Sequence, residues 1–225
     1  MIVEASEPVT LIGGAAWQRA ALDDALALAP RVVAADGGAD AALAAGLKPE
    51  AVIGDMDSLS PEARASLPRQ VIHEIPEQDS TDFDKCLRNI AAPLVLGVGF
   101  SGAWLDHQLA ACNTLVRRPA RRCVLLGREE LLFLAPPTLR LPLPEGTPLS
   151  LFPMGAVEGV SDGLRWPIGG LNFAPDGQVG TSNRATGDVD LAVTAPKMLV
   201  ILPRDMLRQT VRALLEAAAH WPEDG

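Results

Sequence analysis

Two short acidic clusters hold the residues of this sequence that could do chemistry. The first, residues 54–58, has the sequence Gly-Asp-Met-Asp-Ser and follows an apolar run at residues 51–53 that is typical of a buried strand. Because alternate residues of an extended chain point the same way, Asp55 and Asp57 are expected to converge. Paired carboxylates repel unless a cation or a proton lies between them, and Mg²⁺ prefers oxygen ligands. The spacing therefore favours a Mg²⁺ site.

The second cluster, residues 79–85, has the sequence Asp-Ser-Thr-Asp-Phe-Asp-Lys and is predicted to open a helix over residues 81–90. One of its first three residues can cap that helix, and the free N–H groups of a helix start favour a phosphate. Asp82 and Lys85 are three residues apart and lie roughly on one face. Either cluster alone is equally well explained as a turn or a cap. Together, at two strand-to-helix junctions, they favour a metal–phosphate site.

The elements that must position these clusters alternate between strand and helix. Strands are predicted at residues 8–12, 31–35, 51–53, 71–75, 94–98 and 122–126. Helices are predicted at residues 17–28, 39–45, 61–67, 81–90 and 105–116. This alternation predicts an α/β fold with a mostly parallel, Rossmann-like sheet and flanking helices. The suspected acids follow strands, and ligands of such sheets bind at the carboxyl ends of the strands.

The second half of the chain has a different pattern, which begins near the Ala-Pro-Pro sequence at residues 135–137. Short apolar runs separated by Pro and Gly occur at residues 139–143, 149–152, 156–160, 177–180, 190–193 and 198–202. Strands at this spacing predict a small antiparallel β-sandwich, followed by a helix over residues 204–219. We therefore expect two domains, residues 1–135 and residues 136–225.

Composition excludes several classes of function. The 225 residues include 28 acidic and 19 basic side chains, a formal charge of −9 that argues against a nucleic-acid binder. No run approaches the ~20 apolar residues of a membrane span, and no basic segment precedes the N-terminal apolar stretch, so neither a membrane protein nor a signal peptide is expected. The cysteines, Cys86, Cys112 and Cys123, lack C-x-x-C spacing. They are predicted to be free thiols, which fits a cytoplasmic protein.

Glycine-rich segments give only a weak nucleotide signal. Gly13-Gly14 follows the first predicted strand, and residues 97–102 place Gly at the first, third and sixth positions of a dinucleotide-type motif. The expected acid about 20 residues later is absent, and no Walker motif occurs. A dinucleotide-binding site is therefore not favoured.

The ordered series of short motifs resembles that of the thiamine pyrophosphokinases. The motifs are Ala-Asp-Gly-Gly-Ala at residues 35–39, the acidic clusters at 54–58 and 78–85, Leu-Asp-His at 105–107, Gly-Leu-Arg-Trp-Pro at 163–167 and Ser-Asn at 182–183. The likeness extends from about Gly13 to Leu202. It implies an enzyme that transfers the terminal diphosphoryl group of ATP to the hydroxyl of thiamine, by attack on the β-phosphorus. The products would be thiamine diphosphate and AMP.

The resemblance also implies roles on the nucleotide side. The Mg²⁺ ligands would be Asp55, Asp57 and Asp82. Residues that contact the cofactor and ATP would be Asp36, Gly37, Gln78, Thr81 and Lys85. Either Asp82 or Asp106 would accept the hydroxyl proton, and the sequence does not choose between them.

On the thiamine side, the resemblance implies that Trp166 stacks on the cationic substrate, with Ser182 and Asn183 lining the pocket. Members of the family work as homodimers in which the second domain of one subunit completes the active site of the other. The expected partners are therefore ATP, thiamine and a second copy of the chain, with no nucleic acid and no membrane.

One position departs from the family pattern. Where the family usually has Gly-Gly-Arg-x-Asp-His, residues 102–107 have the sequence Gly-Ala-Trp-Leu-Asp-His, so Trp104 replaces an arginine. Either another cation such as Arg128 or Arg184 substitutes, or activity is altered. Two alternatives therefore stay open. One is a Mg²⁺-dependent nucleotide phosphohydrolase, which needs the acids but not Trp166, and the other is a non-catalytic thiamine- or nucleotide-binding protein.

Overall fold

The chain divides into two compact units in the computed structural model, which describes residues 1–102 and 104–222. The first unit comprises residues 1–114 and 125–128, and the second comprises residues 115–124 and 129–225. Ala103, within the 102–107 stretch, and the last three residues of the predicted second domain lie outside the described residues. The mixed α/β class predicted from the sequence is confirmed.

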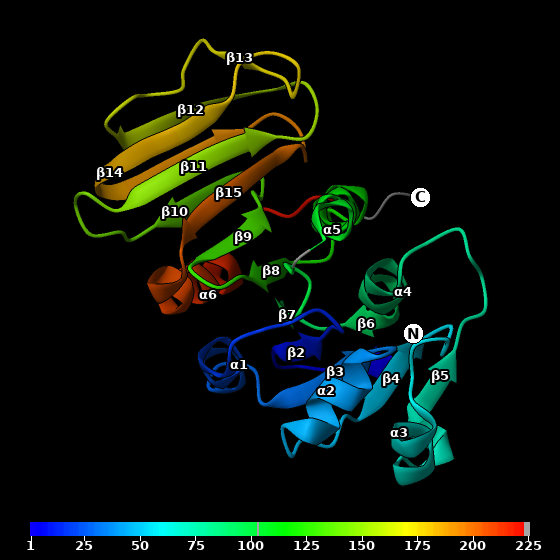
Figure 1. The fold of residues 1–225 in the computed structure, drawn as a ribbon. Helices are drawn as coiled ribbons and strands as arrows, with labels where there is room; N and C mark the ends of the chain where they lie inside the picture. Colours follow the sequence, from blue (N-terminus) through cyan, green and yellow to red (C-terminus); the bar gives the residue numbers. More distant parts are fainter. Residues whose placement is uncertain (103, 223–225) are drawn as a thin grey trace. The chain divides into compact units, whose positions relative to one another are not determined.

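The first unit is built on a parallel sheet in which the spatial order is β7–β2–β3–β4–β5. The strands are β2 (Val9–Ile12), β3 (Arg31–Ala35), β4 (Ala51–Gly54), β5 (Ile72–Glu74) and β7 (Val95–Val98). Two short strands, β1 (Val3–Glu4) and β6 (Ile90–Ala91), form a separate parallel pair. Because all five sheet strands run the same way, their carboxyl ends lie along one edge (Figure 1).

Helices connect the parallel strands. They are α1 (Arg19–Leu26), α2 (Gly38–Ala44), α3 (Pro61–Ser66), α4 (Asp82–Asn89) and α5 (Leu105–Arg117), with a 3₁₀ turn at Arg69–Val71. Side-chain caps define two helix starts: Ser60 Oγ accepts from Ala63 N at 3.1 Å, and Thr81 Oγ1 accepts from Asp84 N at 3.2 Å. Helix α2 packs on β2 and β3, and α4 packs on β3 and β4. The helix that follows Asp36, α2, and the helix that carries Asp82, α4, are thus both anchored to the sheet.

The second unit contains antiparallel strands. They are β9 (Glu130–Leu134), β10 (Thr138–Leu141), β11 (Pro148–Pro153), β12 (Val157–Leu164), β13 (Asn172–Phe173), β14 (Gly180–Val193) and β15 (Met198–Pro203). The long strand β14 pairs with β11 through its first half and with β10 and β12 through its second half. A 3₁₀ turn at Arg204–Met206 leads into α6 (Leu207–Glu216). The remaining strand, β8 (Cys123–Leu126), contributes residues to both units.

Several predicted elements differ from those observed. The strand expected at residues 190–193 is the end of a 14-residue strand, β14, and the strand expected at residues 177–180 is absent except for Gly180, with which β14 begins. Its inward positions include Asn183 and Ala185 instead of large apolar residues, so the alternation that marks a strand was hidden. Strand β9 was also missed, and α1 begins at Arg19 instead of residue 17. As predicted, no disulfide joins the cysteines among the described residues; Cys86 and Cys123 are buried and Cys112 is half-buried. Among the described helices, none is both long and apolar enough to cross a membrane.

Candidate metal and phosphate site

Three carboxylates converge at the carboxyl edge of the first unit's sheet. Asp36 follows β3, and Asp55 and Asp57 follow the neighbouring strand β4. One oxygen from each side chain lies within 4.8 Å of those of the other two. Like charges at this distance require a shared proton or a cation. The predicted convergence of Asp55 and Asp57 is therefore observed, with Asp36 as its third member.

The convergence arises from a turn, and the expectation of an extended chain here was wrong. Met56 has a φ of 64°, in the left-handed region that side chains seldom adopt. This turn folds the chain back so that Asp57 N donates to Asp55 Oδ1 at 3.4 Å. The Met56 side chain is held in an apolar cluster with Val52 and Leu59. Packing beneath the turn thus maintains the position of the two acids above it.

Asp36 is the buried member of the group, with 2% of its surface exposed. Its Oδ2 accepts from Ser58 N at 3.2 Å, whereas its Oδ1 has no hydrogen-bond partner among the described residues. Burial raises the pKa of Asp36 to about 7, opposed by the Ser58 bond and reinforced by the charges of Asp82 and Asp57. A buried oxygen without a partner, facing other carboxylates, is a position that a cation or a proton would satisfy.

The buried side chain of Lys85 places a positive charge beside these acids. It is 1% exposed, and its Nζ lies 3.0 Å from Asp55 Oδ2 and 3.1 Å from Asp82 Oδ1. Burial alone would lower the pKa of Lys85, but its bonds to Asp55 and Asp82 more than offset this and raise it. The same contact, with help from Gln78, lowers the pKa of Asp55 to about 2 despite partial burial. Lys85 is therefore part of the acidic site and not a solvated helix lysine.

Asp82 borders the three-carboxylate group from the start of α4. A Cβ atom at Gly54 would lie 2.7 Å from Asp36 Cβ and 3.0 Å from Asp82 Oδ1, so only glycine fits between these acids. Asp82 is not itself a member of the group within 4.8 Å. Its assignment as a metal ligand stays a prediction.

The residues present fit a bound Mg²⁺. The donors are carboxylate oxygens only, and one of them is buried without a partner. Mg²⁺ takes hard oxygen ligands, typically one or two carboxylates together with substrate phosphates and water. The residues that would hold it are Asp36, Asp55 and Asp57, with Asp82 adjacent.

Other predicted nucleotide-side residues occupy different positions. Gln78 Nε2 donates to Asp55 Oδ2 at 3.0 Å, which joins Gln78 to the site. Thr81 caps α4, and Gly37 lies against Ser58, whose Oγ donates to Asp57 Oδ1 at 2.8 Å. The structure thus adds Ser58, which lies inside the first motif but received no role from the sequence.

Asp106 lies apart from the three-carboxylate group, in the first turn of α5. It is exposed, and its Oδ1 accepts from the N–H of the next residue, His107, at 2.9 Å. Trp104, two residues before Asp106, is also exposed.

The second unit brings Trp166 and Asn183 together. Asn183 Oδ1 accepts from Trp166 N at 3.2 Å, and Asn183 Nδ2 donates to Trp166 O at 2.7 Å. Asn183 is buried, whereas half of the Trp166 surface is exposed, and the Arg165 guanidinium lies 4.9 Å from the ring centroid. Ser182, with a φ of 64°, donates its N–H to Ser150 Oγ at 3.0 Å. Asn183 thus holds the backbone of Trp166, and the Arg165 guanidinium lies over one face of the exposed ring.

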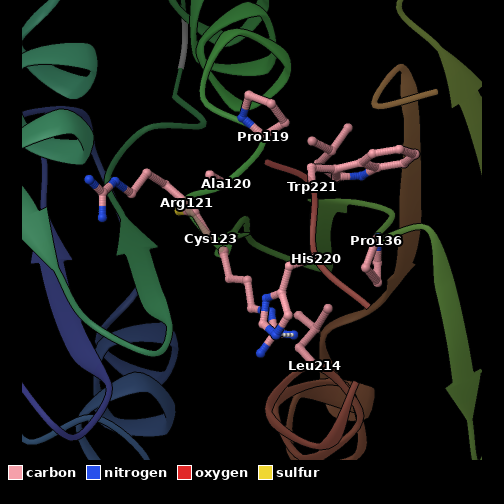
Figure 2. Close-up of a pocket in the computed structure, with 10 residues that line it drawn as sticks. Pro119, Ala120, Arg121, Cys123, Pro136, Leu214, His220 and Trp221 are labelled. Carbon is pink, nitrogen blue, oxygen red and sulfur yellow. Dashed lines mark hydrogen bonds between the residues drawn. The ribbon is translucent and has the colours of Figure 1, made fainter. Parts of the chain in front are cut away.

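A hollow in the second unit, shown in Figure 2, is too small for a substrate. It lies beside the segment after α6, where Arg122 Nη2 donates to Ala217 O at 2.6 Å and Trp221 Nε1 donates to Ala135 O at 2.8 Å. Its volume of about 20 Å³ is enough for roughly one water molecule. Its residues tie the C-terminal segment to the unit, and we assign them no chemistry.

Comparisons with known proteins agree on one family. Residues 22–125 match the family model described as thiamin pyrophosphokinase, catalytic domain. Thiamine pyrophosphokinase 1 of Oryza sativa subsp. japonica is 31% identical over 173 residues, which are 65% of this chain and 66% of that protein. Thiamine pyrophosphokinase 1 of Arabidopsis thaliana is 32% identical over 155 residues, 60% of this chain and 58% of that protein. The chain therefore spans between 58% and 66% of the length of these curated relatives.

Solved structures share the fold. Thiamin pyrophosphokinase from Geobacillus thermodenitrificans aligns with a TM-score of 0.70 and 19% identity, covering 87% of this chain and 96% of that one. Yeast thiamin pyrophosphokinase aligns with a TM-score of 0.70 and 17% identity, covering 88% of this chain and 86% of that one. At such identities the alignments establish the fold alone, and they extend the likeness beyond the matched catalytic domain.

Proposed function

We propose, from the premise that the chain belongs to the thiamine pyrophosphokinase family, that it transfers the terminal diphosphoryl group of ATP to the hydroxyl of thiamine. The products are thiamine diphosphate and AMP. The observation that carries the proposal is the convergence of three carboxylates, one of them with a buried unpartnered oxygen, beside the buried ammonium of Lys85. Such a site suits metal-bound phosphates.

The chain's own residues mainly position the reactants and balance charge, which is what phosphoryl transfer requires of a protein. When bound, Mg²⁺ would neutralise charge on the phosphate chain. Asp55 and Asp57, with Asp36 and Asp82, would bind the Mg²⁺ ion. Lys85 adds a fixed ammonium group next to these carboxylates. Gln78 orients Asp55 through its amide.

The bond changes follow from the products. The thiamine hydroxyl oxygen forms a bond to the β-phosphorus, while the bond from that phosphorus to the oxygen bridging it to the α-phosphorus breaks and AMP departs with that oxygen. The hydroxyl proton passes to a carboxylate, either Asp82 or Asp106, and then to solvent. Trp166 offers its ring face to the cationic substrate, as it already does to Arg165.

The two substrates are assigned to different domains. We infer that the first unit, which lies within the predicted residues 1–135, is a Rossmann-like domain for ATP and Mg²⁺, and that the second unit, which includes the predicted residues 136–225, is a β-sandwich domain for thiamine. The parallel order of the first sheet and the exchange of partners along β14 support these assignments. The buried thiols of Cys86 and Cys123 fit a reducing cytoplasm.

We further propose a homodimer in which the partner subunit's Trp166 serves each site. The test mixes Asp57→Asn with Trp166→Ala after joint refolding and assays them at a thiamine concentration too low for either variant to show activity alone. A mixed dimer contains one site with both residues intact, so part of the activity should return. If the mixture stays as inactive as its components, each site is built from one subunit.

AMP release from ATP is the experiment that tests the activity. AMP that forms with Mg²⁺ only when thiamine is present supports the proposal. AMP without thiamine would make the protein a phosphohydrolase, and no AMP at all would leave a binding protein. Trp166→Ala should raise the KM for thiamine with little change for ATP. Val160→Ala, which also truncates an exposed apolar side chain of the second unit, is the matched control and should change neither.

A further inference from the structure

The loop over residues 75–81 joins β5 to α4 and brings Gln78 to the three-carboxylate group (Figure 1). Gln78 Nε2 donates to Asp55 Oδ2 at 3.0 Å, and Lys85 Nζ donates to the same oxygen at 3.0 Å. The other oxygen, Oδ1, accepts from Asp57 N at 3.4 Å. Three donors from three segments thus fix the orientation of one carboxylate. Because Lys85 is buried and Asp57 donates through its backbone, Gln78 is the donor that depends most on its loop.

A second set of contacts holds this loop. Glu77 Oε1 accepts from Arg88 Nη2 at 2.5 Å and also from the Ser80 hydroxyl. Glu77 and Ser80 lie on either side of Gln78 in the chain, whereas Arg88 is in the last turn of α4. The bond from Ser80, followed by the bond from Arg88, holds the pKa of Glu77 below its usual value, so this carboxylate stays charged. The loop is therefore tied to α4 beside the residue that contacts Asp55.

The position of Arg88 on α4 suits a supporting role. Arg88 follows Lys85 by three residues, so the two side chains lie roughly on one face of the helix. Lys85 reaches Asp55 directly, whereas Arg88 is connected to it through Glu77 and Gln78. Within the described residues, Arg88 Nε is buried without a hydrogen-bond partner, which is unfavourable. The charged contact between Nη2 and Glu77 opposes that cost.

We propose that Arg88 is a positioning residue of the metal site: through Glu77 it fixes the 75–81 loop, so that Gln78 stays bonded to Asp55 Oδ2. The inference rests on the metal site of the proposed function. Among the described residues, the ion-pair partner of Arg88 is Glu77 and not one of the three acids. Groups that orient metal ligands affect metal affinity although they do not touch the metal. Loss of Arg88 should therefore weaken metal binding without removing a ligand.

The test is a double-mutant cycle on Mn²⁺ affinity, measured by electron paramagnetic resonance on the full-length chain without nucleotide. Gln78→Ala and Arg88→Met should each weaken Mn²⁺ binding by about tenfold. If Arg88 acts through Gln78, the double variant should bind about as well as Gln78→Ala alone, because the bond to Asp55 is already lost. A double variant weakened by the product of the two single effects, about a hundredfold, overturns the inference.

Two further variants separate positioning from a general loss of structure. Arg88→Lys keeps a cation for Glu77 and should recover most of the Mn²⁺ affinity. Arg31→Met is the matched control, because Arg31 pairs with Glu50 at 2.9 Å and these side chains are 31% and 34% exposed, against 30% and 36% for Arg88 and Glu77. Arg31 begins β3, at the end of the strand opposite Asp36, so this control should bind Mn²⁺ normally.

Urea denaturation establishes that each variant is folded under the binding conditions. A merely structural Arg88 would lower stability and leave the Mn²⁺ affinity of the folded protein unchanged, and that result also overturns the inference. A wild type that binds no Mn²⁺ overturns it as well.

Thiamine-dependent AMP release, measured in the same variants, tests the proposed function separately. Arg88→Met should need more Mg²⁺ for its half-maximal rate, and excess Mg²⁺ should restore the rate without a change in the KM for thiamine. If the wild type releases AMP with thiamine but the effects of Arg88→Met and Gln78→Ala multiply, the inference fails and the proposed function holds. If the effects do not multiply and the wild type releases no AMP, the inference stands and the proposed function fails.

Discussion

Lys85 Nζ lies 3.0 Å from Asp55 Oδ2 although 30 residues separate the two in the chain. The contact joins the turn after β4 to the first turn of α4, and it places an almost fully buried ammonium among carboxylates. Removing one partner of a buried pair leaves an uncompensated charge. This contact should therefore contribute strongly to the free energy of unfolding of the metal-free protein.

Lys85→Met should destabilise the metal-free protein. We expect a loss of about 2–3 kcal/mol in the free energy of unfolding, somewhat below the usual figure for a buried pair because Asp82 is partly exposed. Urea denaturation in EDTA measures it, and added Mg²⁺ should recover part of the loss. Lys48→Met, the same change at an exposed lysine, should cost less than about 0.5 kcal/mol. Equal effects of the two substitutions would contradict the structure.

Asp36 should make the stability of the metal-free protein depend on pH. Its folded-state pKa of about 7 exceeds the ordinary value of 3.8, so its contribution is complete below about pH 4 and is lost as the pH rises through 7. Asp36→Asn lacks this dependence, and asparagine tolerates the positive φ of this position. Relative to the wild type, the variant should gain about 4 kcal/mol between pH 4 and pH 8, at 1.36 kcal/mol per pKa unit.

Denaturation midpoints in EDTA at several pH values measure the Asp36 effect. Asp176→Asn, at an exposed position of the second unit, is the control and should follow the wild type throughout. A stability difference between Asp36→Asn and the wild type that does not vary with pH would show that Asp36 ionises normally.

Divalent metal should bind at the three-carboxylate group. Asp57→Asn is expected to weaken Mn²⁺ binding, measured by electron paramagnetic resonance in the absence of nucleotide, by at least tenfold, since even outer-shell changes at metal sites cost 10- to 100-fold. Asp82→Asn tests the remaining predicted ligand and should show a similar loss. Asp176→Asn again serves as control. Wild-type affinity in Asp57→Asn would place the metal elsewhere.

Gly54→Ala should displace the carboxylates of the site, because Gly54 lies between Asp36 and Asp82. The added methyl group would lie 2.7 Å from Asp36 Cβ, and overpacking of this kind costs about 1–3 kcal/mol. We expect lower stability in denaturation and weaker Mn²⁺ binding. Gly177→Ala, whose Cβ would make only an ordinary contact at 3.6 Å, is the matched change and should be nearly neutral. A fully active, fully stable Gly54→Ala would refute the crowding of acids around this glycine.

Much of the first unit follows from local pattern. Continuous apolar runs such as β2 and β4 must be buried on both faces, and their alternation with helices dictates parallel pairing. Asp55 and Asp57 were predictable because they follow such a run. The sequence offered Asp79, Ser80 and Thr81 as possible caps of the next helix, and the structure shows that Thr81 is the cap. In the second unit the pattern failed at β14, where Asn183 and Ala185 occupy inward positions.

The sequence alone determined the residue types of the site and the strand ends that carry them, because both depend on neighbours within a few positions. Only the tertiary structure decided that Asp36 is buried with an unpartnered oxygen, that Lys85 bridges Asp55 and Asp82, and that Arg88 contacts Glu77. Burial and charge pairing depend on which distant segments the sheet brings together, and no local spacing encodes those distances.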